Sequence, residues 1–284
     1  MRFLPPIRIH IWGGLGSQLY AWALYIDLSE RLPHRRLHLI FHNGGVTKRD
    51  PDIAQFFKAD AVKVVLDFSN KSQETGRKPS GFQARILGKN ILARILTFLG
   101  FLSNCDGSRS FNKLKPWVLE VRGHYSYRRI KQSTAQEIFR QLIDGNQADS
   151  TDLYIGVHDR LGDLMALASK GPTPVDSLLS EMLKGIQRNP SLNVKVFSDS
   201  IEEAKKRLSP LGDLAKIEYC ALNPTLTILA LVNSEYFVGT SSKISLWVVI
   251  FRNFVHPEKN GVMPSNLEDN LISNIGTRAN ISCY

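Results

Sequence analysis

Hydrophobic residues along this chain follow two patterns in turn, short β-rich runs and longer stretches with helical spacing. Residues 7–12 form the first predicted strand, and an apolar helix follows that ends before Pro33. Residues 37–41 form the next strand, so the chain opens with a strand–helix–strand unit, which is typical of a parallel sheet. Two further strands are predicted in this half, at 62–68 and 118–121.

The second half of the chain repeats the strand–helix unit. Its predicted strands are 153–157, 194–197, 217–220 and 236–238, and its predicted helices are 175–186, 201–208, 226–232 and 244–251. Such alternation predicts an α/β fold with doubly wound parallel sheets. The polar, turn-rich residues 144–150 are the predicted linker, which divides the chain into lobes 1–150 and 151–284. After Pro257 the pattern is weak.

A long amphipathic helix is predicted over residues 82–102. Its apolar residues recur at helical spacing, and Arg85, Lys89 and Arg94 lie between them. Such a stripe is typical of a helix packed on the core of its own protein. It is also typical of a helix that lies on an anionic membrane surface. Both interpretations remain open at this point.

The chain carries an excess of positive charge. Its 36 Lys and Arg residues against 26 Asp and Glu give a formal net charge of +10. This balance favours an anionic partner such as a nucleotide, a nucleic acid or an acidic lipid. The basic residues are spread through both halves instead of alternating with aromatic residues on one face, so a nucleic-acid partner ranks last.

Other classes of site find little support in the sequence. The three cysteines and seven histidines show no metal-ligand spacing, and the D-x-D sequence at Asp50 and Asp52 is predicted to be a turn, so we expect no metal. The N-terminal residues lack the apolar core of a signal peptide, and no apolar stretch reaches about 18 residues, the length of a spanning helix. These features predict a cytoplasmic protein.

Small, polar or charged clusters follow four of the predicted strands. They lie at residues 13–18, 158–163, 198–200 and 240–242. In open α/β sheets, ligands bind beyond the carboxyl ends of parallel strands. We therefore expect the residues of these four clusters to lie at the ligand-binding edges of the sheets.

The glycine cluster has two interpretations. Gly13, Gly14 and Gly16 either expose backbone amides to an anion or a sugar, or make only a tight turn before the helix. They do not complete the dinucleotide fingerprint G-x-G-x-x-G, because Leu19 occupies its last position. The acidic residue expected at the end of the second strand is also replaced, so a dinucleotide site is not favoured.

The other three clusters also have structural alternatives. Arg160 either binds a pyrophosphate through its planar guanidinium or forms a surface ion pair with Asp159 or Asp163. Asp199 or Ser200 is predicted to cap the following helix; the alternative is that Asp199 orients Arg160 or accepts a hydrogen bond from a base or a ribose. Ser241 and Ser242 suit a phosphate at a helix N-terminus, or serve only as a cap of that helix.

Taken in order, these clusters resemble motifs of the bacterial α-1,2-fucosyltransferases and of the wider α-1,2/α-1,6 superfamily. The similar stretches are GGLGSQL at 13–19, HDRLGD at 158–163, VFSDSIE at 196–202, SSKISLW at 241–247 and, more faintly, GHYS at 123–126. The resemblance extends from about residue 9 to about residue 250. Each motif alone is weak, but their order and separation make the set fairly specific.

The resemblance implies a GT-B type fold, in which two Rossmann-like lobes with parallel sheets flank a cleft. It implies an inverting glycosyltransferase that moves fucose from GDP-fucose to a galactose-type hydroxyl in an α-1,2 linkage, without a metal or other cofactor. The acceptor would be an oligosaccharide or a lipid-linked glycan of cell-surface polysaccharide or O-antigen synthesis. A protein with this task is expected in the cytoplasm, with peripheral contact to an anionic membrane.

The resemblance also implies roles for particular residues. The expected catalytic residues are His158, Arg160 and Asp163, with Arg160 stabilising the charge of the leaving GDP. The residues expected to bind the donor are Gly14, Gly16, Ser17, Gln18, Arg160, Asp199, Ser241 and Ser242. The first lobe, with the glycine loop and the helix 82–102, would bind the acceptor.

Several positions depart from the family pattern. Leu161 replaces a second arginine, Ser17 replaces an asparagine, and Ser200 replaces an aspartate. We expect an arginine at position 161 to be tolerated, since it restores the resembled motif. These departures leave two alternatives to a fucosyltransferase: a transferase for a different sugar nucleotide, and a non-catalytic relative that only binds a nucleotide sugar or a glycan.

Overall fold

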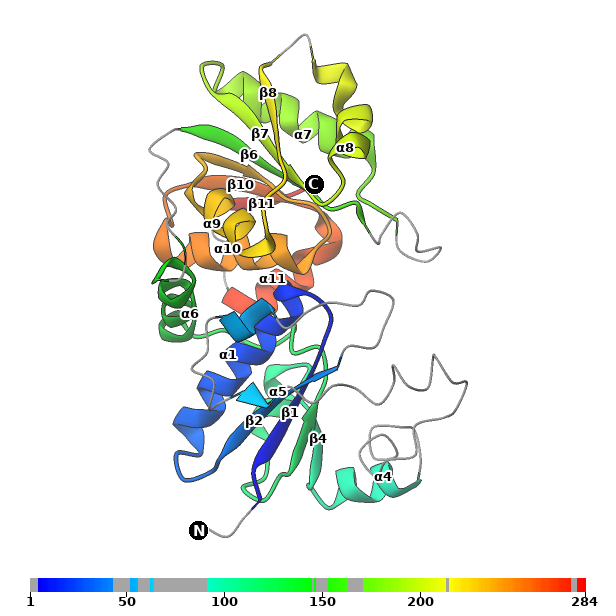
Figure 1. The fold of residues 1–284 in the computed structure, drawn as a ribbon, viewed down its shortest axis with the longest axis vertical. Helices are drawn as coiled ribbons and strands as arrows, with labels where there is room; N and C mark the ends of the chain where they lie inside the picture. Colours follow the sequence, from blue (N-terminus) through cyan, green and yellow to red (C-terminus); the bar gives the residue numbers. More distant parts are fainter. Residues whose placement is uncertain are drawn as a thin grey trace. The chain divides into compact units, whose positions relative to one another are not determined.

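The computed structural model describes residues 5–42, 52–55, 62–63, 91–144, 146, 153–162, 171–212, 215–276 and 280–284. The chain divides into two units, Met1–Thr134 and Ala135–Tyr284. Each unit contains a parallel sheet with helices, and the predicted α/β class is therefore confirmed (Figure 1). The sequence predicted the division at residue 150, whereas the units separate after residue 134.

The first unit is built on a five-stranded sheet with the strand order β3-β2-β1-β5-β4. Its strands are β1 (Ile7–Trp12), β2 (Leu37–His42), β3 (Val62–Lys63), β4 (Leu102–Asn104) and β5 (Glu120–Arg122). Its helices are α1 (Leu15–Arg31), the 3-10 turn η1 (Asp52–Gln55), α4 (Ile91–Phe98) and α5 (Ser108–Asn112). The described strand pairs are all parallel, as the opening strand–helix–strand unit predicted.

Strand β1 has two chemically different faces. Ile7, Ile9 and Ile11 are almost fully buried, and the apolar helix α1 packs on β1 and β2. Because side chains alternate along a strand, Arg8 and His10 lie on the opposite face. One face of this sheet therefore forms apolar core, and the other carries polar chemistry.

The second unit is built on a six-stranded sheet with the strand order β11-β10-β9-β6-β7-β8. Its strands are β6 (Tyr154–Asp159), β7 (Asn193–Ser198), β8 (Ile217–Cys220), β9 (Tyr236–Val238), β10 (Asn260–Met263) and β11 (Ile281–Cys283). Its helices are α6 (Gln132–Asp144), α7 (Val175–Arg188), α8 (Ile201–Leu208), η4 (Ser209–Leu211), α9 (Pro224–Asn233), α10 (Lys243–Val255), η5 (Ser265–Leu267) and α11 (Glu268–Ile275).

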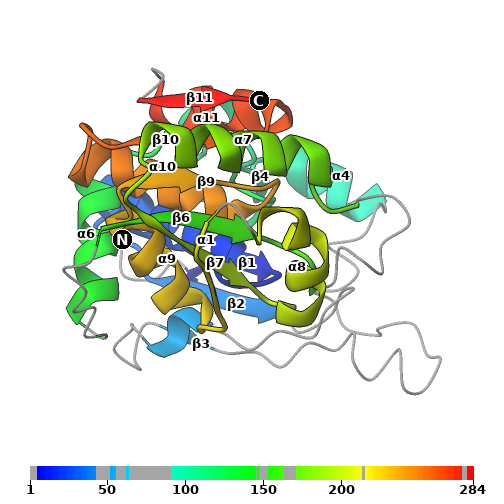
Figure 2. The same cartoon turned by 90° about the horizontal axis from the view of Figure 1, so that it is seen from above.

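Helices cover both faces of this second sheet. Helices α9 and α10 pack against each other on one face (Figure 1), and α7 lies over the opposite face (Figure 2). The chain runs from β6 outward through β7 to β8, and then crosses back to place β9 on the other side of β6. The strand order thus reverses between β6 and β9, which is the point where open α/β sheets bind ligands.

The local structure departs from the sequence prediction at the helix expected over residues 82–102, and it has elements that the sequence did not indicate. The long helix predicted over 82–102 is α4 in the described region and ends at Phe98, and Leu102 is a buried residue of strand β4; residues 82–90 lie outside the description. No helix or strand was predicted after Pro257, where the pattern is weak, but the structure has β10, α11 and β11 in that region. Helix α6 belongs to the second unit, where Phe139 packs on Phe251 of α10 with ring centroids 5.2 Å apart.

Candidate functional site

The predicted clusters of the second unit meet at the carboxyl edge of its sheet. Strand β6 pairs with β7 on one side, where Asp159 is opposite Ser198, and with β9 on the other. The residues that follow these strands are therefore neighbours across the reversal point. The backbone N–H of Arg160 donates to Thr240 Oγ1 at 3.2 Å, which links the loops after β6 and β9.

Asp199 organises the loop that follows β6. Its Oδ1 accepts hydrogen bonds from the backbone N–H groups of Leu161 and Gly162, both at 3.0 Å. Its Oδ2 lies 3.2 Å from Nε of Arg160. Of the two predicted caps, Ser200 occupies the N-cap position of α8, without a side-chain hydrogen bond. Asp199 instead contacts Arg160 and its loop, as the alternative interpretation described.

Close packing explains why a glycine stands at position 162. A Cβ atom added to Gly162 would lie 2.3 Å from Asp199 Oδ2, far inside contact distance. The loop can therefore approach the carboxylate only without a side chain at this position. The arrangement holds the guanidinium of Arg160 half-buried, with 23% of its side chain exposed.

Leu161 does not lie beside Arg160 at the surface. Its side chain is fully buried and belongs to the apolar core formed with Val157, Val196 and Leu178. The expectation that arginine would be tolerated here is therefore wrong, since a buried guanidinium would lack a partner in an apolar environment. The physical reason is that successive side chains of this loop point in opposite directions, so that Arg160 is partly exposed and Leu161 is buried.

His158 lies inside the protein and ties β6 to helix α10. Its Nδ1 is 2.8 Å from Ser245 Oγ and 3.3 Å from Ser242 Oγ. Burial, together with the charge of Arg160, lowers its pKa to about 4. The imidazole is therefore neutral at pH 7, which favours a positioning role behind Arg160.

Ser242 is the N-cap of α10, because its hydroxyl accepts a hydrogen bond from the backbone N–H of Ser245. Ser241 has a different environment. Its backbone N–H donates to Thr173 Oγ1 at 3.0 Å, and its Oγ accepts from Asn266 Nδ2 at 3.0 Å. Of the two serines, Ser241 is the one that borders an open space.

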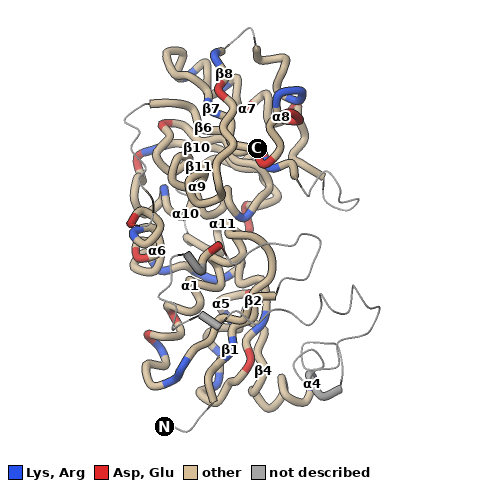
Figure 3. Tube along the Cα trace, in the orientation of Figure 1, with Lys and Arg blue, Asp and Glu red and all other residues tan. Residues whose placement is uncertain are grey.

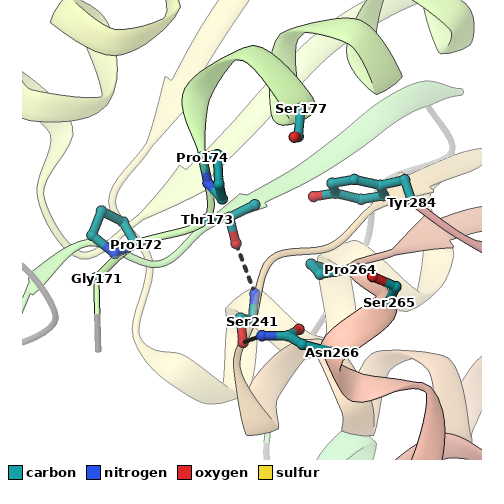
Figure 4. A pocket seen from close by; sticks show the side chains of 10 residues that line it. All are labelled: Gly171, Pro172, Thr173, Pro174, Ser177, Ser241, Pro264, Ser265, Asn266 and Tyr284. Atoms are coloured by element: carbon teal, nitrogen blue, oxygen red, sulfur yellow. Dashed lines mark hydrogen bonds between the residues drawn. The ribbon is translucent and has the colours of Figure 1, made fainter. Parts of the chain in front are cut away.

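That space is a cavity of about 510 Å³ at the ends of β9, β10 and β11 (Figure 4). The lining residues come from the segment before α7, the start of α7, and the segments after these three strands: Gly171, Pro172, Thr173, Pro174, Ser177, Ser241, Pro264, Ser265, Asn266 and Tyr284. Hydroxyl and amide groups converge on it, together with one aromatic ring. A volume of this order is typical of small-molecule sites.

Two residues of this region, Thr173 and Tyr284, were missed by the sequence reasoning. Thr173 and Tyr284 line the cavity, and Asp159 is fully buried behind the loop, 3.4 Å from Nε of Arg207. Burial raises the pKa of the Asp159 carboxyl, and the charge of Arg207 opposes that shift. The turn residues before α7 were a usable signal for Thr173, but nothing in the sequence singled out Tyr284.

The glycine cluster lies in the first unit, directly after β1. Gly13 adopts φ +86°, which favours glycine, and Gly14 is the N-cap of α1 without a side-chain hydrogen bond. Gln18 is buried, donates from Nε2 to the Gly13 carbonyl at 3.1 Å and accepts from the backbone N–H of Ile53 at 3.0 Å. Its amide therefore braces the turn, while Gly16 is buried and Ser17 is half-buried.

Three predicted aspartates have different positions relative to the described residues. Asp163 and Asp50 lie outside the described residues, and Asp52 begins the 3-10 turn η1.

Among the described residues, no group of three or more His, Cys, Asp or Glu side chains is placed to hold a metal ion. Where the chain is described, Lys and Arg occur along both units, and so do Asp and Glu (Figure 3). None of the described helices is long and apolar enough to cross a bilayer.

Comparison with solved structures identifies the fold. The structure of E. coli heptosyltransferase WaaC with ADP matches 98% of this chain and 93% of its own, with a TM-score of 0.51 and 12% identity. A family 9 glycosyl transferase from Veillonella parvula matches 100% of this chain and 87% of its own, with a TM-score of 0.49 and 13% identity. The structure of POFUT1 in complex with GDP matches 90% of this chain and 98% of its own, with a TM-score of 0.44 and 15% identity.

The chain has the GT-B fold, with two parallel α/β units, as the motif resemblance implied. No protein-family model and no curated protein sequence matches the chain. At these low identities the likeness establishes architecture. The resemblance to α-1,2-fucosyltransferases stays a prediction.

Proposed function

We propose that this protein is a glycosyltransferase whose second unit binds a nucleotide-sugar donor at the carboxyl edge of its sheet. The observation that carries the proposal is the position of Arg160, which Asp199 holds at the point where the strand order reverses. The GT-B fold and the order of the sequence motifs support the same conclusion. On those motifs, the donor is GDP-fucose and the transfer forms an α-1,2 linkage to a galactose-type hydroxyl with inversion.

Arg160 would act on the phosphates of the donor. Its contact with Asp199 through Nε sets the plane of the guanidinium, and a planar guanidinium binds phosphate oxygens in a bidentate manner. Negative charge develops on the nucleoside diphosphate as its bond to the sugar breaks. A positively charged group already in place lowers the energy of that transition state, so no metal is needed in this proposal.

The cavity beside Ser241 would accept another part of the donor. Its wall includes the first turn of α7, where backbone N–H groups have no intrahelical partner, and the hydroxyls of Thr173 and Ser177. Hydroxyl groups and helix N-termini bind phosphate and sugar oxygens. Ser241 connects this cavity to Thr240, and thus to the Arg160 loop.

A ligand screen tests the donor. The melting temperature is measured with GDP, GDP-fucose, ADP-heptose, UDP-sugars and dTDP-sugars in EDTA, because ligand binding to the native state raises it. GDP-fucose is expected to give the largest rise, followed by transfer to a galactoside in a product assay. Binding without transfer would support the non-catalytic alternative, and binding that requires Mg²⁺ or Mn²⁺ would contradict the metal-free proposal.

Substitution of Arg160 tests the mechanism. Arg160→Ala is expected to lower the transfer rate at least about 100-fold in a folded protein, the scale for loss of one charge-stabilising donor. Arg160→Lys should also lose most activity, because an ammonium does not provide two parallel donors. Arg109→Ala, at an exposed position on α5, is the matched control. Near-normal turnover of Arg160→Lys would contradict the assignment.

We also propose that the protein contacts an anionic membrane through helix α4. Phe98 is 91% exposed, and Ile95, Leu99 and Trp117 are each nearly half exposed. Trp117 donates from Nε1 to the Leu99 carbonyl at 2.9 Å, so this aromatic ring lies next to the helix end. Exposed apolar residues with nearby basic groups suit a bilayer interface, where a lipid-linked acceptor would be found.

Vesicle flotation tests the membrane contact. Binding is expected to anionic vesicles, to weaken in high salt, and to be lost when Phe98→Glu removes the most exposed apolar side chain. Arg94→Glu should weaken binding to anionic vesicles in particular. Equal binding to neutral vesicles, or none to anionic vesicles at low salt, would contradict the proposal.

A further inference from the structure

A buried ion pair joins the end of β6 to helix α8. Asp159 is the last residue of β6, directly before Arg160, and its side chain is fully buried. Its Oδ2 lies 3.4 Å from Nε of Arg207 on α8, whose side chain is 14% exposed. Within the described part of the chain, neither carboxylate oxygen of Asp159 has a hydrogen-bond partner. A buried carboxylate of this kind depends on the positive charge beside it, so the two side chains hold each other in place.

The same guanidinium also holds one wall of the cavity beside Ser241. Nη2 of Arg207 donates to the carbonyl of Thr173 at 2.8 Å. Thr173 lines the cavity between Pro172 and Pro174. Prolines have no N–H to donate and bias the preceding residue toward an extended backbone, so this segment does not fix itself by helical hydrogen bonds. Its position therefore depends on the contacts that Thr173 makes with other elements.

Two routes of contact connect Thr173 to the end of β6. The first route passes through the loop after β9, because the backbone N–H of Arg160 donates to Thr240 Oγ1 at 3.2 Å. In the same loop, the backbone N–H of Ser241 donates to Thr173 Oγ1 at 3.0 Å. The second route is the buried ion pair and its hydrogen bond to the Thr173 carbonyl. The two routes close a circuit that fixes the cavity wall relative to Arg160.

We propose that Arg207 is a positioning residue for the donor, which holds the Thr173 wall of the cavity at a fixed separation from Arg160, and that Asp159 keeps Arg207 in place. The inference rests on the proposed binding of a nucleotide-sugar donor and names residues that determine its affinity. Arg207 acts through Thr173, since the residues that line the cavity do not include it in the described part of the chain. A nucleotide that occupies both the cavity and the Arg160 contact depends on their separation, whereas a ligand that reaches Arg160 alone does not.

The variant Arg207→Lys separates charge from geometry. In the arginine, Nε faces Asp159 and Nη2 faces the Thr173 carbonyl, so two nitrogen atoms of one planar group make the two contacts. A lysine keeps the positive charge beside Asp159, but its single ammonium does not reproduce both directions. The variant is expected to fold and to bind GDP about tenfold more weakly, the lower end of the scale for a hydrogen bond to a charged group. Binding of inorganic pyrophosphate, which engages Arg160 alone, should stay unchanged.

Isothermal titration of the full chain with GDP and with pyrophosphate, both in EDTA, measures these affinities. Lys206→Met, at an exposed position on the same helix, is the control and should bind both ligands like the wild type. In a transfer assay, Arg207→Lys should raise the donor KM and leave kcat nearly unchanged, as expected for a loss of binding alone. Equal weakening of GDP and pyrophosphate in Arg207→Lys, or no weakening of either, would overturn the positioning role.

The double variant Asp159→Leu with Arg207→Met separates positioning from stability. Arg207→Met alone leaves an unpaired buried carboxylate and should lower the urea midpoint of unfolding, whereas the double variant removes both charges and should unfold close to the wild-type midpoint. Its GDP affinity is still expected to be low, because the Thr173 carbonyl lacks its donor. A stable double variant with wild-type GDP affinity would overturn this inference alone. A wild-type protein that binds neither GDP nor pyrophosphate would overturn the proposed function, and the positioning role with it.

Discussion

The buried imidazole of His158 predicts a specific dependence of stability on pH. Burial lowers its pKa from 6.5 to about 4. As the pH falls below 6.5, the unfolded chain binds a proton at this ring, whereas the folded protein excludes that proton until about pH 4. Because the unfolded state binds more protons across this window, the free energy of unfolding falls as the pH falls. The neutral imidazole of His158 therefore makes the protein more stable at neutral pH than at acidic pH.

The size of the effect follows from the separation of the two pKa values. Each pH unit between them corresponds to about 1.36 kcal/mol, so His158 alone lowers the free energy of unfolding by about 3 kcal/mol between pH 7 and pH 4. His158→Gln keeps a side chain that can hydrogen-bond Ser245 but cannot bind a proton. Between pH 7 and pH 4, the free energy of unfolding of the variant should therefore fall by about 3 kcal/mol less than that of the wild type, whatever the variant's stability at pH 7.

Urea unfolding at a series of pH values between 4 and 7 measures the effect. Carboxyl groups titrate in both proteins, so the relevant quantity is the difference between the wild-type and His158→Gln curves. His34→Gln, which replaces an exposed histidine, should run parallel to wild type. If the His158→Gln curve is also parallel to wild type, the imidazole is not buried in its neutral form and the reasoning is refuted.

Two further predictions concern buried side chains of the second unit. Leu161→Arg should lower the free energy of unfolding by at least about 3 kcal/mol, because it places an unpaired charge in the core, whereas Leu161→Met should cost less than about 1.5 kcal/mol. Arg252 is 1% exposed and donates to the carbonyls of Leu231, Val232, Ser234, Glu235 and Asn260. Burial lowers its pKa to about 10, so it stays charged at pH 7, and Arg252→Met should cost at least about 3 kcal/mol. Denaturant unfolding checks both, and a loss below about 1 kcal/mol in either variant would contradict the assigned environment.

Local patterns in the sequence were sufficient to predict the class of fold and the sheet edge at which the candidate site lies. Strands 7–12, 37–41, 153–157 and 236–238 were recognised because buried parallel strands leave short β-rich runs between helical stretches. Each of the second unit's polar clusters follows such a strand. Since parallel strands all end at the same edge, the sequence predicted that Arg160, Asp199 and Ser241 gather at one edge of a sheet.

The roles of individual side chains depended on contacts that no local pattern contains. Leu161 matched a surface position of a motif, yet the turn after β6 directs it into the core. Glu120 and His10 are 110 residues apart and meet only because β5 pairs with β1. Periodicity reports which side of a strand or helix meets the interior. Which polar groups then face one another is decided by strand order and register, and these are set by the packing of the whole sheet.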